Sequence, residues 1–207
     1  MIKFGTGGWR AIIGDEFTFS NVRRVAQAAA LYLKEIKKDH LPVVVGHDLR
    51  FLSGRFSRAI AEILVQNGIQ VWFMEQVAPT PMLMFAVEQE HLALGLMVTA
   101  SHNPSEYNGI KVIVEGGKDA PVEVTSRLEE LCRDIPPLQA PPLSFFDALE
   151  QGKITIYCNK NAYIDSLLRQ IDVPAVQQRN LNVLFNPMFG VSKDTMAMCL
   201  ASLRCSV

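Results

Sequence analysis

The sequence predicts an α/β protein whose mixed, mostly parallel sheet is flanked by helices. Short apolar runs typical of buried strands alternate with amphipathic segments typical of helices, and the order strand, helix, strand implies a parallel βαβ unit. The 207 residues are 49% hydrophobic, which is ample for a packed core. We expect one α/β domain over residues 1–150 and the truncated beginning of a second, similar domain over residues 151–207.

Helix and strand patterns alternate along the first half of the chain. Residues 21–37 carry apolar side chains at helical spacing, with Ser20 as the expected N-cap. The run "PVVVGHD" predicts a strand, "SGRFSRAIAEILVQNG" a helix capped by Ser53 and ended by Gly68, and "IQVWFM" a second strand. Together these segments predict the first βαβ unit.

Two further strands are expected around a polar connection. The segment "APTPMLMFAVEQE" predicts a helix with Thr80 as its cap and Pro81 in its first turn. The buried runs "LALGLMV" and "IKVIV" follow. If Asn108 and Gly109 form a tight turn, these runs pair antiparallel, which makes the sheet mixed.

A proline-rich segment marks the expected edge of the first domain. A helix is predicted from Pro121 to Arg133, and the prolines of "IPPLQAPPL" then sustain neither a helix nor a central strand. Beyond them we expect a strand "KITIYC", a helix over 161–171, a strand "LNVLF" and a helix from Ser192. This second unit has too few strands to bury its own faces, so we expect the chain to be part of a longer protein.

Composition excludes several classes of partner. The 20 Lys and Arg residues nearly cancel the 21 Asp and Glu, and a net charge of −1 provides no field that attracts nucleic acid or an anionic membrane. No signal peptide or membrane-spanning run is evident, so we expect a cytoplasmic protein. The four cysteines are widely spaced, which predicts free buried thiols.

Hydrogen-bonding residues gather in the connection "VTASHNPSEYNGIKV". Ser101 follows a buried strand, where open α/β sheets place ligands, and His102 and Lys111 are candidates to activate its hydroxyl. Singly, these residues also suit an ordinary turn on the surface. Neither the G-x-S-x-G pattern of α/β-hydrolases nor the Walker phosphate loop is present, which leaves phosphoryl transfer to and from the serine.

The segment "TASHNPSEYNGIKV" resembles the active-site loop of the α-D-phosphohexomutases, the phosphoglucomutase/phosphomannomutase family. "FGTGGWR", "VVVGHDLRFLS" and "APTPML" are similar to three further motifs of that family, in the same order, and "VLFNPMFGVS" resembles the start of its second domain. Ala11 and the bulky Trp9 depart from the usual opening motif. The resemblance implies the fold of phosphohexomutase domain I for the first half of the chain.

The resemblance also implies roles for individual residues. Ser101 is the expected phosphoserine, Lys111 and Arg10 are the cations that assist proton movement and bind phosphoryl oxygens, and His102 and Asn103 shape the loop. A phosphate adds roughly −1.5 to −2 charges, which calls for cations and N–H donors nearby.

Asn103 and three further residues are expected at the phosphate or substrate. Thr6 and Gly7 lie in the turn "GTGG", which can present backbone N–H groups to an anion. Arg50 matches the second motif, and its pairing with Asp48 after a strand end is expected to orient the loop.

The resemblance implies a Mg²⁺ ion as cofactor. In the family this ion is held by the serine phosphate and by three aspartates of a D-G-D-x-D-R loop in the second domain. That loop is absent from this sequence, so Ser101, through its phosphate, is the only expected ligand here.

The implied function is that of an isomerase of carbohydrate metabolism, an intramolecular phosphotransferase. With its remaining C-terminal domains, the protein is expected to interconvert hexose 1-phosphate and hexose 6-phosphate through a hexose 1,6-bisphosphate, whereas residues 1–207 alone are expected to be inactive. Glucose, mannose, glucosamine and pentose phosphates all remain candidate substrates. The alternative is a non-catalytic sugar-phosphate-binding or regulatory protein on the same scaffold.

Overall fold

The computed structural model describes residues 2–5 and 7–207, which form two compact units. The first extends to Tyr157 and the second comprises residues 158–207. The first unit contains the sheet and every motif quoted above except "VLFNPMFGVS".

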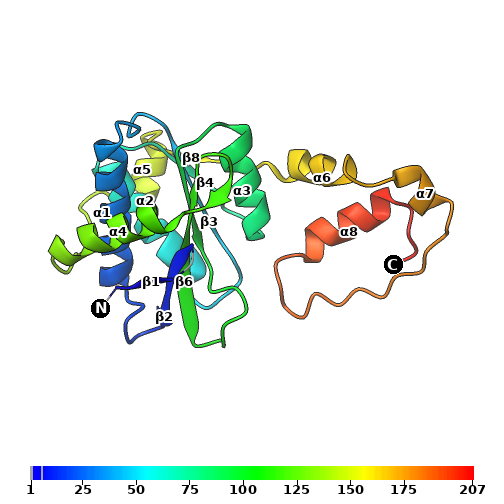
Figure 1. Cartoon of the computed structure of the whole chain (residues 1–207), viewed down its shortest axis with the longest axis horizontal. Coiled ribbons are helices and arrows are strands. Elements are labelled where there is room, and N and C mark those ends of the chain that lie inside the picture. Colours follow the sequence, from blue (N-terminus) through cyan, green and yellow to red (C-terminus); the bar gives the residue numbers. More distant parts are fainter. Residues whose placement is uncertain (1, 6) are drawn as a thin grey trace. The chain divides into compact units, whose positions relative to one another are not determined.

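One sheet organises the first unit (Figure 1). Its strands lie in the order β1-β2-β6-β5-β3-β4-β8. The strands are β1 (Phe4–Gly5), β2 (Gly8–Ile12), β3 (Val43–His47), β4 (Val71–Phe73), β5 (Leu94–Val98), β6 (Tyr107–Val114) and β8 (Ile154–Ile156), and β7 (Lys118–Asp119) pairs with β6. The neighbours β5-β3-β4-β8 run parallel, whereas β6 is antiparallel to both β5 and β2. The expected mixed sheet is confirmed.

Helices cover both faces of this sheet. They are α1 (Phe19–Glu35), α2 (Ser53–Gln66), α3 (Thr80–Gln89), α4 (Val122–Asp134) and α5 (Phe145–Glu150). The helices α1, α2, α4 and α5 lie on one face and α3 on the other (Figure 1). The apolar faces of α1 and α2 pack on the buried side chains of the strands, which forms the main core.

Aromatic side chains fix β2 against the helices. Trp9 stacks on Phe17 with ring centroids 4.8 Å apart, and Phe17 meets Phe56 of α2 edge to face at the same distance. All three are at most 1% exposed. Since side chains alternate along a strand, burial of Trp9 on this face directs Arg10 to the other face of the sheet.

The helices begin slightly differently from the expectation. The N-cap of α1 is Thr18, whose hydroxyl accepts from the backbone N–H of Asn21 at 3.3 Å, and Ser20 lies inside the first turn. Ser53 is the first residue of α2, and its hydroxyl is used in tertiary hydrogen bonds rather than as a cap. The preceding Leu52 adopts a left-handed conformation with φ 61°.

The expected turn at Asn108 and Gly109 is wrong, although the antiparallel pairing of the two strands is confirmed. Both residues lie within β6, where they face Ala11 and Arg10 of β2. The reversal between β5 and β6 is made by residues 99–106 instead. The turn preference of the Asn-Gly pair is overridden because both residues pair with β2 and the carbonyl of Gly109 accepts from the N–H of Thr99.

The first unit continues past the expected boundary at residue 150, to Tyr157. The β8 strand, assigned above to the second domain, pairs in parallel with β4, and the ring of Phe145 meets that of Phe73 edge to face at 4.7 Å. The proline-rich segment is therefore a connection inside the first unit. That residues beyond 157 begin a second, similar domain stays a prediction.

The second unit consists mainly of helices α6 (Lys160–Leu168), α7 (Val173–Gln177) and α8 (Lys193–Ser202). The strand expected for "LNVLF" does not form in the described residues, where Asn182 makes an isolated bridge with Ser206. A strand needs hydrogen-bonding partners along its whole length, whereas here the carbonyl of Leu181 and the N–H of Val183 both bond to the single residue Ser206.

The cysteines agree with the expectation of free thiols but not with uniform burial. Cys132 and Cys199 are buried, Cys205 is partly exposed and Cys158 is exposed. Among the described residues, no helix combines the length and hydropathy that crossing a membrane requires.

Close approach of three strands requires a glycine at position 109. A Cβ atom there would lie 2.6 Å from the carbonyl oxygen of Trp9 and 2.7 Å from that of Thr99. We expect Gly109→Ala to lower the free energy of unfolding by about 1–3 kcal/mol, because backbone atoms of two strands must move. Urea denaturation measures this loss. At the control position Gly5 the nearest atom is 3.9 Å away, so Gly5→Ala should stay within about 0.5 kcal/mol of the parent.

Burial distinguishes the reactivity of the cysteines. Desolvation raises the pKa of Cys132 to about 12, so its reactive thiolate is scarce at pH 8. We expect an aromatic disulfide reagent at pH 8 to modify exposed Cys158 in the folded protein and Cys132 only after denaturation. Mass mapping of the labelled peptides measures the order, and equal rates at the two positions would contradict the burial of Cys132.

Candidate functional site: the loop between strands 5 and 6

The candidate site is built on the connection that leaves β5 after Val98. The backbone N–H of Asp48, just past β3, donates to the carbonyl of Val98 at 3.1 Å, so the carboxyl ends of β3 and β5 lie together. Thr99 continues the pairing by donating its N–H to the carbonyl of Gly109 at 2.9 Å. The loop therefore begins at the sheet edge where open α/β folds bind ligands.

Ser101 stands exposed on this loop in a conformation rare for its residue type. Its φ is 54°, in the left-handed region, which costs on the order of 1 kcal/mol or more. Its N–H donates to the hydroxyl of Thr99 at 3.1 Å, and its own Oγ lies 3.2 Å from Nδ1 of His102. The exposed hydroxyl is thus free of apolar packing and shares a hydrogen bond with an imidazole.

Arg10 reaches the same loop from β2. Its Nη1 donates to Oδ1 of Asn103 at 3.1 Å, across 93 residues of sequence. Because this bond is exposed and its acceptor is a neutral amide, an anion can compete for the guanidinium. Arg10, one of the two predicted cations, is therefore in contact with the loop that carries Ser101.

Lys111 lies on the same face of the sheet as Arg10. Arg10 faces Gly109 and Gly8 faces Lys111 across the β2–β6 pair, which makes the two cations diagonal neighbours. Lys111 also faces Met97 of β5, whose side chain is on the face that α3 covers. The two predicted cations therefore share one side of the sheet.

Lys111 has a partner that the sequence reasoning missed. Its Nζ lies 2.8 Å from Oδ1 of Asp119 in β7. The described part of the glycine-rich turn is close by, since a Cβ on Gly7 would come within 3.1 Å of Cγ of Asp119. Gly7 has φ +71°, which glycine adopts readily. Thr6, the other residue predicted in this turn, lies outside the described residues.

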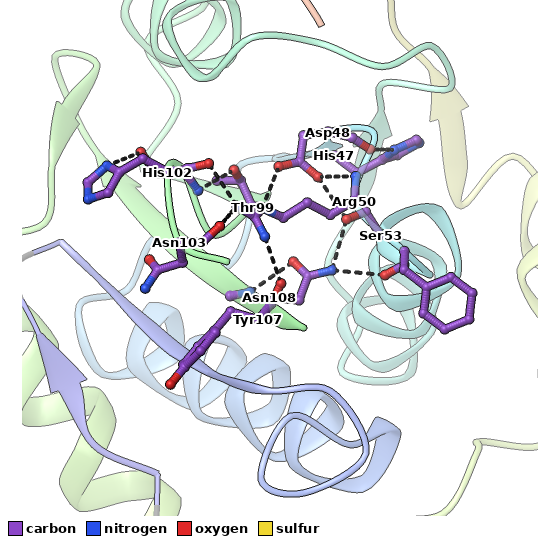
Figure 2. Close-up of polar contacts among 12 residues, drawn as sticks. His47, Asp48, Arg50, Ser53, Thr99, His102, Asn103, Tyr107 and Asn108 are labelled. Carbon is purple, nitrogen blue, oxygen red and sulfur yellow. Dashed lines mark hydrogen bonds and ion pairs between the residues drawn. The ribbon is translucent and has the colours of Figure 1, made fainter. Parts of the chain in front are cut away.

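Arg50, which is expected at the phosphate or substrate, donates hydrogen bonds to backbone carbonyls of the loop. The side chain runs from the segment after β3 into the loop (Figure 2). Its Nη1 donates to the carbonyls of Pro104 at 2.8 Å and Tyr107 at 3.0 Å, and its Nη2 donates to those of Ser101 at 2.9 Å and Asn103. The expected ion pair with Asp48 is present, with Nε 3.8 Å from Oδ2.

A polar network of Asp48, Ser53 and Asn108 holds Arg50 in place. Asp48 accepts from the backbone N–H of Arg50 at 2.9 Å and from the hydroxyl of Ser53 at 2.8 Å. That hydroxyl accepts from the side-chain amide of Asn108 at 2.9 Å, and the amide oxygen accepts from the N–H of Gly109 at 2.8 Å (Figure 2). Asn108 is fully buried and Ser53 is 1% exposed.

Sequence reasoning missed Asp119, and it missed the tertiary use of Ser53. Asp119 follows the matched segment by a few residues and has no motif of its own, so only its placement on a strand next to Lys111 could have indicated it. For Ser53, the serine of the second motif was interpreted as a helix cap.

The described residues do not complete a site for Mg²⁺. Among them, no group of three or more His, Cys, Asp or Glu side chains is placed to hold a metal ion. Ser101 supplies a single oxygen, whereas Mg²⁺ prefers a near-octahedral set of oxygens.

Comparison with known proteins identifies the family. Residues 1–137 match the family described as phosphoglucomutase/phosphomannomutase, alpha/beta/alpha domain I. The chain belongs to the phosphoglucomutase/phosphomannomutase family, and the fold of the first unit is that of its domain I. This result confirms the resemblance on which the predicted roles depend.

Relatives from different organisms carry related names. The chain is 33% identical over 212 residues to a phosphoglucomutase of Staphylococcus saprophyticus, covering 98% of this chain and 37% of that protein. It is 30% identical over 225 residues to a phosphoribomutase of Saccharomyces cerevisiae, covering 100% of this chain and 36% of that protein. The chain thus spans little more than a third of the length of these relatives.

A solved structure from Thermus thermophilus, described as a candidate phosphomannomutase, superposes with a TM-score of 0.82. It is 31% identical, and the match covers 100% of this chain and 44% of that one. A phosphoglucomutase/phosphomannomutase family protein from Burkholderia thailandensis, 23% identical, has the same fold with a TM-score of 0.78 over 99% of this chain and 43% of that one.

The buried amide of Asn108 should matter to stability more than the exposed amide of the loop. Asn108→Ala leaves the Gly109 N–H without its acceptor, so we expect it to lower the free energy of unfolding by about 2 kcal/mol. Asn103→Ala, the matched control, removes one exposed hydrogen bond and should cost less than about 0.5 kcal/mol. Similar losses for the two variants in urea denaturation would contradict the network.

Proposed function

We propose that this chain is the phosphoserine-bearing part of a phosphohexomutase. The observation that carries the proposal is the exposed hydroxyl of Ser101, in a strained backbone conformation beside His102, on a loop that Arg10 also contacts. Backbone strain at an exposed polar residue is typical of functional sites, and membership of the mutase family supports a phosphoryl carrier.

The proposed reaction is two phosphoryl transfers through Ser101. In the first, the bond between phosphorus and Oγ of phosphoserine breaks, a bond forms to a free hydroxyl oxygen of the hexose phosphate, and the hydroxyl proton moves to the serine oxygen. The resulting hexose 1,6-bisphosphate then reorients in the site, so that its other phosphoryl group faces Ser101. In the second, its other phosphoryl group returns to Ser101, and the net change moves the phosphate between C1 and C6.

Each residue near the loop has a proposed part in this chemistry. Arg10 exchanges its contact with Asn103 for phosphoryl oxygens, and Lys111 supplies positive charge and assists proton movement from the same face of the sheet. His102 shares the Ser101 proton through Nδ1. Such transfers depend mainly on positioning and on neutralising phosphoryl charge, which these groups supply without a covalent step of their own.

The relatives are longer than this chain, and their additional length bears on substrate recognition and metal binding. We propose that sugar recognition and the acidic ligands of Mg²⁺ come from C-terminal domains of the same protein, and that this chain meets the ion only through the phosphate of Ser101. The relatives are named for glucose, mannose and ribose phosphates, so all three remain candidate substrate classes.

The decisive variant is Ser101→Ala in the full-length protein. We expect kcat for conversion of glucose 1-phosphate to glucose 6-phosphate to fall by at least about 10³-fold, because the carrier oxygen is lost. Ser105→Ala, an exposed serine in the same loop, is the matched control and should keep its activity. Unchanged turnover in Ser101→Ala would refute the assignment.

A direct test follows the phosphoryl group. Incubation of the full-length protein with glucose 1,6-bisphosphate should add one phosphoryl group to the peptide that contains Ser101, detected by mass mapping, while residues 1–207 alone should show no mutase turnover. A Ser101 that stays unmodified in the full-length protein would favour the non-catalytic binding protein instead.

A further inference from the structure

We infer that Arg50 is a positioning residue that shapes the Ser101 loop through its backbone carbonyl groups, and that it does not bind the transferred phosphate. The inference rests on the proposed function of Ser101 as a phosphoryl carrier. It gives Arg50 a role different from the expected one, and the donors and acceptors around the guanidinium are the reason.

The guanidinium has its donors occupied by the protein. Of its five N–H groups, two on Nη1 and two on Nη2 match the four hydrogen bonds to the loop, and Nε faces Asp48 at 3.8 Å. The side chain is 15% exposed. A phosphate could bind Arg50 only by displacing loop carbonyls, whereas Arg10 gives up one exposed bond.

The four carbonyls explain why a cation is needed beneath the loop. Their oxygens come from Ser101, Asn103, Pro104 and Tyr107, which are close together in sequence. Carbonyl oxygens carry partial negative charge, and a phosphoserine adds roughly −1.5 to −2 charges beside them. These negative charges repel one another, and hydrogen bonding of all four oxygens to the Arg50 guanidinium offsets the repulsion.

The same bonds set the direction of a backbone donor. In a planar trans peptide the C=O and the following N–H point in opposite directions. Because the Ser101 carbonyl accepts from Nη2 of Arg50, the N–H of His102 is directed away from the guanidinium. The clamp, meaning Arg50 with its four carbonyl acceptors, therefore stabilises Ser101 in its left-handed conformation and turns an adjacent N–H donor toward the other side of the loop, where it can meet an anion.

Asp48 holds Arg50 in place for this task. It accepts from the Arg50 backbone N–H at 2.9 Å and lies beside Nε, and it also accepts from the Ser53 hydroxyl at 2.8 Å. The planar fork of arginine suits several acceptors at fixed angles, whereas a lysine ammonium is a compact point charge with three donors. Arg50→Lys therefore keeps the charge next to Asp48 and loses the geometry.

The first test measures the loop in the 207-residue chain, without reference to activity. In Arg50→Lys we expect amide hydrogen exchange of the peptide covering residues 99–107 to accelerate at least about tenfold, while peptides from the core strands are unchanged. Arg55→Lys is the matched control, because Arg55 is an exposed arginine of α2 that lies over the ring of Phe19. Unchanged exchange in Arg50→Lys would overturn the clamp.

The second test measures the consequence for catalysis in the full-length protein. We expect Arg50→Lys to lower kcat about 10- to 100-fold with KM for glucose 1-phosphate within about twofold, because the reacting group is misplaced and no substrate contact is lost. Ethylguanidinium should partly restore kcat in Arg50→Ala and leave Arg55→Ala unaffected. A raised KM with unchanged kcat would show that Arg50 binds substrate phosphate and would overturn the inference.

The two tests separate this inference from the proposed function. If Ser101→Ala retains activity, the proposed function fails, and the exchange measurement still decides whether the clamp exists. If Ser101→Ala is inactive while Arg50→Lys keeps its kcat, the proposed function stands and the positioning role of Arg50 is refuted.

Discussion

The hydrogen bonds from one guanidinium to four backbone carbonyls determine how the loop between β5 and β6 is held. A loop that leaves a sheet loses strand partners for its carbonyl groups, and these groups need donors. Arg50 supplies the donors, and Asp48 and Ser53 fix Arg50 in turn. The position of the Ser101 hydroxyl thus depends on the hydrogen bonds of Arg50, Asp48 and Ser53 rather than on packing of the apolar core.

Packing of the apolar core determines on which face of the sheet the cations Arg10 and Lys111 lie. Burial of Trp9 against Phe17 on the helical face of β2 leaves Arg10 on the opposite face. Glycine at position 109 lets β2 and β5 approach β6 closely, and the register of β2 with β6 then sets Arg10 beside Lys111. Apolar packing and backbone register together decide which charges can meet the loop.

The sequence was sufficient for the fold class and for the order of α1, β3, α2, β4, α3, β5, β6 and α4 in the first unit, whereas it indicated none of β1, β2, β7 and α5. Periodicity finds α1, α2 and the buried strands because these elements follow local patterns. Resemblance to the family's motifs indicates Ser101, His102 and Arg10. A local hydrophobic pattern cannot indicate them, because they come together only in the folded chain. Features that depend on tertiary partners were not predictable in this way. Asn108 and Gly109 have the composition of a turn, but pairing with β2 and a hydrogen bond from Thr99 to Gly109 hold them within β6.

The position of β8 has a consequence for the limits of the folding domain. The match to the family's domain I ends at residue 137, whereas the sheet is completed by the later strand Ile154–Ile156. A protein shortened to the matched region would leave β4 as an open edge and would remove the ring that covers Phe73. The end of the domain I match and the end of the folded unit are therefore different in this chain, and recombination or truncation at residue 137 would expose a strand able to pair with another molecule.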